Sequence, residues 1–328
     1  DNLYILLGHV KCAAYELPFE EGESYAKGVS TKELLDYLCE EHILNLTGGR
    51  YYWMAEEFPA ADLSLRSVTS ENFLIIDITH PEHRVVIGEM DRYTVPMLLH
   101  EHAIYMHEGQ QYQVEKLDFP EKKAYVRSVN VDYYTDADLN TSVKVLDVLK
   151  EQPLGEGTLA YGEVLVTWLV TMFKKFKLDT QETLGFGPVD LPELEMPTNA
   201  CWWALDEQIT SGLSMDDLQG GMLGIANALR QIIPIYLMCS PRDICVQYRV
   251  RDPFTKLPTL LVFDNYAGGI GLSEKVYGMR SLIFSDVHDL IAGCPCETGC
   301  PSCTGPATEV GERGKKTALL LTERLMVR

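Results

Sequence analysis

The 328-residue sequence lacks any apolar run of the ~20 residues that a membrane-spanning helix needs. Its best candidate, residues 164–173, is interrupted by Thr167 and Thr171. Low-complexity stretches are missing too, and 46% hydrophobic against 23% charged residues is typical of folded globular proteins. We therefore expect a soluble protein of two or three domains, with no membrane among its partners.

Positive charge is scarce, because 28 Lys and Arg stand against 48 Asp and Glu, giving a formal net charge of −20. A chain of this charge has no long-range attraction to a polyanion, so any contact with nucleic acid must come from a local patch. A stretch in which cations alternate with aromatic residues can bind single-stranded nucleic acid through phosphate contacts and base stacking. For the first of the two groups below, ordinary lysines at a strand end beside buried phenylalanines are a slightly better interpretation. The candidate nucleic-acid-binding residues form two groups: Lys174, Lys175 and Lys177 around Phe173 and Phe176, and Arg313, Lys315 and Lys316.

A nucleotide-hydrolysing motif is also missing. Residues 314–317 imitate the end of a phosphate-binding loop, but Lys316 stands where Ser or Thr belongs, and Glu309 stands where the first glycine belongs. The acidic residues at 205–208 have no partner motif that would make them a magnesium site. We therefore expect no ATPase site and no catalytic residue in this sequence.

The first 140 residues predict two modules. Residues 1–60 combine a helix at 3–16, a capping box at Ser30 and Glu33, and a Gly48-Gly49 hairpin turn, which together favour a winged-helix-like domain. Such domains often serve nucleic acid, but the fold alone does not show that function. Residues 61–140 change to a period of two, which predicts a small antiparallel, barrel-like β module.

The remainder, residues 141–328, predicts an α+β domain. A polar stretch with Pro and Gly at 135–157 marks its boundary, and a similar stretch at 185–197 predicts a loop. The fold class is therefore α+β and multidomain. Because the chain begins at Asp1, already inside an apparent helix, we expect a fragment of a longer polypeptide.

Nine cysteines are present, and five of them are scattered among apolar neighbours as expected for buried free thiols. The other four crowd into ten residues, with Gly299 permitting a tight bend between the two pairs. Four thiolates at this spacing can surround one tetrahedral ion and leave no position for substrate, so the role is structural. We favour zinc over an iron–sulfur cluster or free thiols, in a reducing cytoplasmic compartment. The expected ligands are Cys294, Cys296, Cys300 and Cys303.

Two weaker signals remain. Gly268, Gly269 and Gly271 lie between an expected strand and an expected helix, where backbone amides can hold an anion. A tight turn is the better interpretation, because the spacing is not that of a dinucleotide or phosphate-binding loop. The His100-Glu101-His102 stretch invites a metal interpretation, but no third ligand stands at a recognised spacing, so solvated or core histidines are favoured.

Five parts of the sequence resemble those of a known family: residues 2–9, 64–67, 103–109, 268–274 and the four clustered cysteines. They resemble the segments that follow the motor core in MrfA-type DNA helicases, bacterial superfamily 2 enzymes of the YprA/MrfA kind. The resemblance covers essentially the whole chain. Its most specific parts are the glycine-rich loop and the cysteine cluster, whose four cysteines match the family's zinc ligands.

The resemblance implies a parent enzyme that is an ATP-dependent, 3′-to-5′ DNA translocase in the repair of mitomycin-type damage. The two RecA-like motor domains, with their ATP and magnesium, have no counterpart in this sequence, so the chain would be the accessory C-terminal part. Two functions stay open. A DNA-guiding module on single-stranded or tailed DNA is favoured by the winged-helix pattern and the resemblance, whereas a scaffolding module that docks on the motor or a partner is favoured by the charge of −20.

Overall fold

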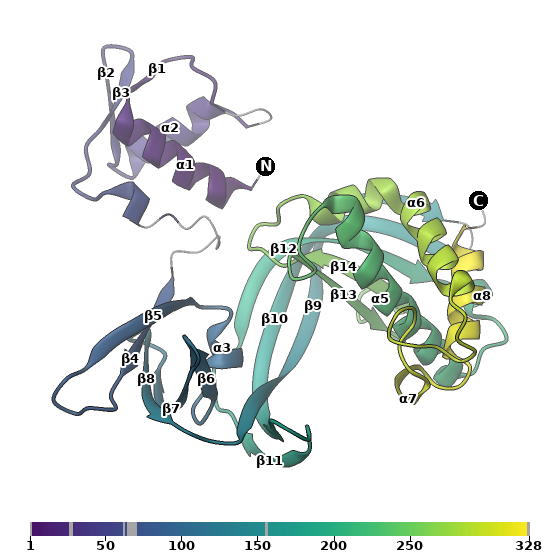
Figure 1. Cartoon of the computed structure of the whole chain (residues 1–328). Coiled ribbons are helices and arrows are strands. Elements are labelled where there is room, and N and C mark those ends of the chain that lie inside the picture. The colour runs from purple at the N-terminus through teal and green to yellow at the C-terminus, as the bar shows by residue number, and fades with distance from the viewer. Residues whose placement is uncertain (1, 26–28, 62, 64–70, 155–156, 327–328) are drawn as a thin grey trace. The chain divides into compact units, whose positions relative to one another are not determined.

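The computed structural model describes residues 2–25, 29–61, 63, 71–154 and 157–326 (Figure 1). The stretch 64–67, which contributes to the resemblance, lies outside the described residues. Residue contacts divide the chain into two compact units, one made of residues 1–2, 143–166 and 196–328 and the other of residues 3–142 and 167–195. Both contain helices and strands, which confirms the α+β fold class, whereas the module bounds 1–60, 61–140 and 141–328 stay a prediction. No helix of the described residues is long and apolar enough to cross a bilayer.

The N-terminal segment forms the predicted helices and hairpin. The Ser30 hydroxyl accepts a hydrogen bond from the Glu33 amide at 3.3 Å, so half of the expected capping box is present. Gly48 and Gly49 take positive φ values of 60° and 76° in the hairpin turn, as a tight two-residue turn requires. The elements are α1 (Leu3–Glu16), β1 (Phe19–Glu20), α2 (Thr31–Glu40), β2 (Leu44–Thr47), β3 (Arg50–Trp53) and the short helix η1 (Pro59–Ala61), with strand order β1-β3-β2.

A five-stranded sheet follows, with strand order β5-β4-β8-β7-β6. All five strands occur where the period of two predicts them, and Phe73, Ile75, Val114 and Val126 form its core. The pairing differs from the expectation in one place, because β4 and β8 are parallel. Among the described residues the order ends at β5 and β6, so the hydrogen bonding is that of an open sheet. The elements are β4 (Asn72–Asp77), β5 (Val85–Asp91), α3 (Val95–Leu98), β6 (Ile104–His107), β7 (Gln110–Asp118) and β8 (Lys123–Val129).

The polar stretch expected as a boundary is instead a strand of 22 residues, β9 (Tyr133–Leu154), which pairs with β10 (Gly157–Lys177). A side chain at Gly162 would place its Cβ 2.0 Å from the Asp147 carbonyl oxygen, so this glycine allows the two backbones to approach. The expected loop at 185–197 also contains strand structure, since β11 (Thr183–Pro188) and β12 (Leu194–Leu205) cover most of it.

The C-terminal elements surround the largest core of the chain. The sheet runs in the order β11-β10-β12-β14-β13, with β9 beside β10. Helices α5, α6 and α8 pack on one another and against the sheet (Figure 1), burying Trp203, Leu229, Val262 and Leu321. The remaining elements are α4 (Glu207–Thr210), α5 (Met215–Leu237), β13 (Ile244–Arg249), β14 (Thr259–Asp264), α6 (Leu272–Gly293), α7 (Ala307–Val310) and α8 (Gly314–Met326).

Candidate metal centre and nucleic-acid interface

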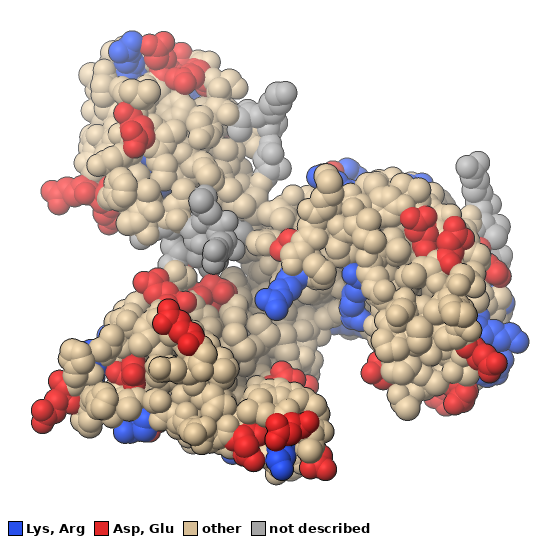
Figure 2. Space-filling model, in the orientation of Figure 1, with Lys and Arg blue, Asp and Glu red and all other residues tan. Residues whose placement is uncertain are grey.

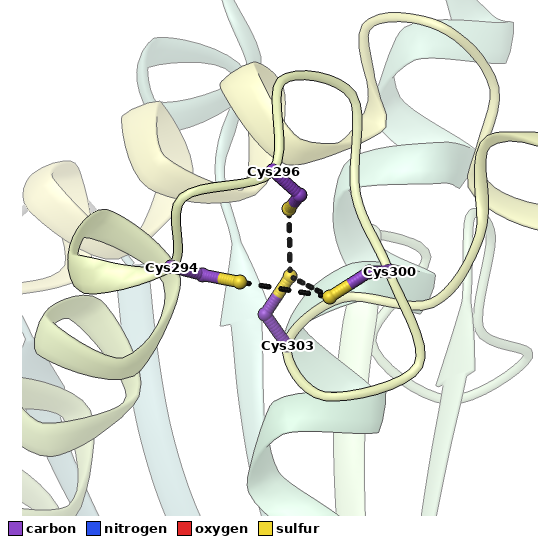
Figure 3. A group of neighbouring side chains, drawn as sticks. All are labelled: Cys294, Cys296, Cys300 and Cys303. Atoms are coloured by element: carbon purple, nitrogen blue, oxygen red, sulfur yellow. Dashed lines mark hydrogen bonds between the residues drawn. The ribbon is translucent and has the colours of Figure 1, made fainter.

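The four clustered cysteines lie in the loop after α6 and point toward one another (Figure 3). Their Sγ atoms all lie within 4.8 Å of one another, with separations of 3.5 Å for Cys294–Cys300, 3.5 Å for Cys296–Cys303 and 3.7 Å for Cys300–Cys303. Sulfurs that surround zinc tetrahedrally at about 2.3 Å lie about 3.8 Å apart. A disulfide would bring two of them to about 2.05 Å. The donor set therefore fits one tetrahedral ion bound by four thiolates.

Backbone hydrogen bonds hold the loop in this shape. The Cys300 carbonyl accepts from the amides of Cys303 at 3.0 Å and Gly305 at 2.9 Å, which turns the chain between the last two ligands. Gly299 has φ +122°, and a Cβ there would lie 2.5 Å from the Gly305 carbonyl oxygen. The tight bend that the sequence assigns to Gly299 is therefore confirmed.

The thiols strongly influence one another's protonation. Burial raises the pKa of Cys303, but backbone hydrogen bonds at Cys300 and Thr304 and the Thr304 hydroxyl outweigh it, so this pKa falls to about 6. A backbone hydrogen bond at Cys296 lowers the pKa of Cys294, but side-chain hydrogen bonds with Cys296 and Cys300 raise it to about 11. The thiolate of Cys303 is thus stabilised and that of Cys294 is disfavoured, and a metal cation bound here would favour the deprotonated form of all four cysteines.

Lys315, predicted as a nucleic-acid contact, lies under the cysteine loop. Its side chain is buried, and its ammonium donates to the carbonyls of Cys294 at 2.7 Å and Cys296 at 2.5 Å, 3.5 Å from the Cys296 sulfur. The sequence carries a signal for this position, since Lys315 shares a stripe of α8 with the buried Ala318 and Thr322. Its charge therefore serves the metal loop.

The neighbouring cations Arg313 and Lys316 are exposed, and Arg313 forms an ion pair with Asp217 at 2.9 Å. The second predicted patch is therefore divided, with one cation turned into the protein and one paired with a carboxylate. Lys316 is therefore the cation of this patch whose side chain makes no hydrogen bond or ion pair among the residues that the structure describes.

The first predicted patch lies at the end of β10, and its phenylalanines are already engaged. Phe173 is buried and stacks on His100, with ring centroids 4.7 Å apart. Phe176 stacks on Tyr134 at 5.5 Å. Stacking of a DNA base on Phe173 is therefore excluded, and the interpretation as lysines beside a buried phenylalanine is correct for this residue.

The lysines of that patch differ in their surroundings. Lys174 is exposed, with its ammonium 4.0 Å from the Asp138 carboxylate. The Lys175 ammonium lies over the Tyr133 ring, 5.2 Å from its centroid. The Lys177 side chain makes no hydrogen bond or ion pair within the described part of the chain. Lys174 and Lys177 are thus the cations of this patch that a phosphate can reach most readily.

His100 is a core residue, as the sequence favours. Its side chain has no exposed surface, and burial lowers its pKa below the usual value. Its Nδ1 lies 2.9 Å from the Glu101 carbonyl oxygen, and its Nε2 has no partner among the described residues. The arrangement is that of a neutral histidine packed on an aromatic ring.

The glycine-rich loop contains its own anion. The buried Asp264 carboxylate accepts hydrogen bonds from the amides of Ile270 at 2.7 Å, Leu272 at 3.1 Å and Ser273 at 2.7 Å, at the start of α6. The amides of Gly268 and Gly269 donate to carbonyls of the chain at 2.8 and 2.9 Å. An internal carboxylate therefore caps the helix and the loop is a tight turn, which is the interpretation that the sequence favours. Binding of an external anion by Gly268, Gly269 and Gly271 stays a prediction.

Two family descriptions match parts of the chain. Residues 1–68 match the winged helix domain of the ATP-dependent helicase HRQ1, in agreement with the helices and hairpin found there. Residues 225–304 match the MrfA Zn-binding domain, and this range ends just after the last clustered cysteine. The match and the four-thiol geometry confirm zinc as the structural metal of this chain.

The relatives that this chain matches include two ATP-dependent helicases. The ATP-dependent helicase YprA of Bacillus subtilis is 45% identical over 325 residues, which cover 99% of this chain and 43% of the relative. The ATP-dependent helicase HRQ1 of Saccharomyces cerevisiae is 25% identical over 327 residues, covering 92% of this chain and 29% of the relative. The chain therefore spans less than half the length of these proteins.

A solved structure agrees with this relationship. The crystal structure of the DUF1998 helicase MrfA bound to DNA matches 98% of this chain and 43% of its own, at 45% identity and a TM-score of 0.65. A second structure of MrfA, bound to DNA and AMPPNP, matches with a TM-score of 0.58 at 43% identity. With its winged helix and its Zn-binding domain, this chain is a C-terminal region of the MrfA/YprA-type helicases.

Proposed function

We propose that this chain is the accessory part of a longer ATP-dependent DNA helicase and guides single-stranded DNA beside the motor. RecA-like motor domains of the same polypeptide would bind ATP and magnesium, and the whole enzyme would move 3′ to 5′ on tailed DNA during cytoplasmic repair of mitomycin-type damage. The observation that carries the proposal is the match of 98% of the chain, at 45% identity, to a helicase crystallised with DNA.

Within this function we propose Cys294, Cys296, Cys300 and Cys303 as the zinc ligands. The zinc would connect the end of α6 to the loop before α7, and through Lys315 to the start of α8. When bound, the ion supplies the positive charge that keeps four thiolates together. Its role is to stabilise the loop, because a site closed by four protein ligands leaves no position for a substrate.

We propose Lys174 and Lys177 on β10 as the phosphate contacts of the guided strand. The test compares the full-length parent helicase with its variant Lys174→Glu plus Lys177→Glu. We expect slower unwinding of a 3′-tailed duplex, while ATP hydrolysis stimulated by a short single strand persists, because the motor would be intact. A matched control reverses two lysines elsewhere in the chain that are both exposed, Lys144→Glu plus Lys256→Glu. Equal unwinding by both variants would reject these contacts.

A protein-docking module is the second candidate function, and the charges of the winged helix favour it. On α2 of this domain, Glu33 and Glu40 stand beside Asp36, and Lys32 pairs with Asp36 at 2.5 Å. On the face drawn in Figure 2, Lys and Arg side chains form small separate groups among Asp and Glu. If this chain binds no single-stranded DNA at low salt but binds separately purified motor domains, docking is its function.

A further inference from the structure

A pocket of about 770 Å³ lies within the unit formed by residues 3–142 and 167–195. Its wall comes from the residues before β6, from β7, from the end of β10, and from β11 with the segment that follows it. Sites for small organic groups usually measure roughly 300–1,000 Å³. The pocket is therefore large enough for a nucleoside, and neither the zinc loop nor the glycine-rich turn contributes to it.

The apolar part of the wall includes an aromatic ring that the fold leaves uncovered. Phe186 on β11 is 75% exposed, although a phenylalanine is normally covered. The next residue, Gly187, allows β11 to lie close to β10, since a Cβ there would be 2.6 Å from the Phe173 ring. Phe186 pairs with Lys174, so its ring projects from the face of the strand pair opposite to Phe173, and it lines the pocket from the edge strand β11. An exposed aromatic ring is a stacking platform for a base.

The polar part of the wall has unused hydrogen-bonding capacity. In the described ranges of the chain, the Gln113 amide and the carboxylates of Glu101 and Asp190 have no hydrogen-bond or ion-pair partner. A phosphate is disfavoured beside two carboxylates. A nucleobase edge suits this set, because carboxylates accept from exocyclic amino groups and a Gln amide pairs with adenine.

We propose that this pocket holds an unstacked base of single-stranded DNA, whose phosphates lie along β10. The inference rests on the proposed DNA-guiding function and adds the site to it. Lys175 also lines the pocket, and Lys174 pairs with Phe186 across β10 and β11, so one cation lies at the cavity for the base and a second lies beside the stacking ring. Lys177 follows on the same strand. Adenine and cytosine, which carry exocyclic amines, are preferred to thymine.

The test measures binding of fluorescein-labelled homopolymers of dA, dC and dT and of an abasic strand to the whole chain at low salt. We expect dA and dC to bind about 5- to 20-fold tighter than dT, as expected for one well-paired base edge. We expect dT in turn to bind tighter than the abasic strand, because thymine still stacks on Phe186. The variant Glu101→Gln plus Asp190→Asn keeps the shapes, removes both charges and replaces one acceptor oxygen of each carboxylate with an amide donor. This variant should reduce the preference for dA and dC over dT to about twofold or less. It should not weaken binding of the abasic strand, which lacks the base edge.

Phe186→Ala should weaken all three homopolymers and spare the abasic strand, because stacking does not depend on the base. A matched control, Glu82→Gln plus Glu108→Gln, changes two exposed carboxylates outside the pocket and should behave as wild type. Thermal melting of each variant shows that it is folded.

The outcomes separate this proposal from the function on which it rests. Equal binding of dA, dC, dT and the abasic strand would overturn the pocket and leave the DNA-guiding function standing. Absence of binding to every strand would reject both. Binding of a Lys-rich peptide that the carboxylate variant loses, with no base preference, would overturn the base site in favour of a protein ligand.

Discussion

At the scale of single residues, the buried ammonium of Lys315 is the strongest constraint on the charge of the metal centre. A buried charge requires a partner of opposite sign or several hydrogen bonds. Lys315 has no Asp or Glu partner within the described residues, and it donates to two carbonyls of the cysteine loop instead. Four thiolates with one zinc carry a net charge of −2, so the loop itself supplies the countercharge once the ion is bound.

The change Lys315→Met therefore weakens zinc retention. Met keeps much of the length of the side chain but removes both the charge and the donors to Cys294 and Cys296. We expect zinc to transfer to a chromophoric chelator at a concentration about 10- to 100-fold lower than wild type requires, as is usual when a group supporting the ligands is lost. The exposed neighbour Lys316→Met is the control. If both variants retain zinc like wild type, Lys315 has no part in holding the ion.

The candidate sites could be predicted from the sequence only where their signal is local. The four cysteines lie within ten residues, so their spacing alone indicates a metal. The stripe on α8 indicates that Lys315 is buried, but its hydrogen-bond partners depend on packing against a loop about twenty residues earlier, which no local pattern states. Phe173 and Phe186 show the same limit, because burial of one and exposure of the other follow from how β10 and β11 pair.

At the scale of elements, the sequence predicts the structures that have strong end signals and misses the polar strands. The Ser30 cap and the Gly48-Gly49 turn define their helix and hairpin correctly. The polar composition of β9 predicts a domain boundary instead of a strand. A weak strand signal is present, because Val143 and Val145 are two residues apart and are less exposed than the residues beside them. Strand β11 contains Gly185, Gly187 and Pro188, which are loop signals in isolation but are accommodated at the edge of a sheet.

Close packing of α5 against α7 and α8 gives a prediction on stability. A Cβ at Gly220 would lie 2.0 Å from the Val310 carbonyl oxygen, whereas a Cβ at Gly278 in α6 meets nothing within 4 Å. Gly220→Ala should therefore destabilise the chain by about 1–3 kcal/mol, the usual effect of overpacking. Gly278→Ala should stabilise it by about 0.5–1 kcal/mol through helix propensity. Urea denaturation measures both, and a stable Gly220→Ala would mean that the two helices can move apart.

At the scale of the whole molecule, a net charge of −20 sets how the chain can use DNA. Several of its cations are engaged internally, since Lys315 is bonded to the cysteine loop and Arg313 pairs with Asp217. The remaining acidic surface repels a polyanion. The motor domains of the parent would therefore supply most of the affinity for DNA, and this chain would supply local contacts.

This charge balance predicts a shallow dependence of DNA binding on salt. Each phosphate neutralised on a single strand contributes a slope of about −0.7 to log affinity against log salt, so two contacts through Lys174 and Lys177 give about −1.4. A tenfold rise in salt then weakens binding by about 25-fold. Fluorescence anisotropy with an abasic labelled strand measures this slope without a contribution from bases. Lys174→Glu plus Lys177→Glu should abolish binding, while Lys144→Glu plus Lys256→Glu should leave the slope unchanged. A slope steeper than about −3 would show that other cations carry the contact, because two lysines cannot release that many counterions.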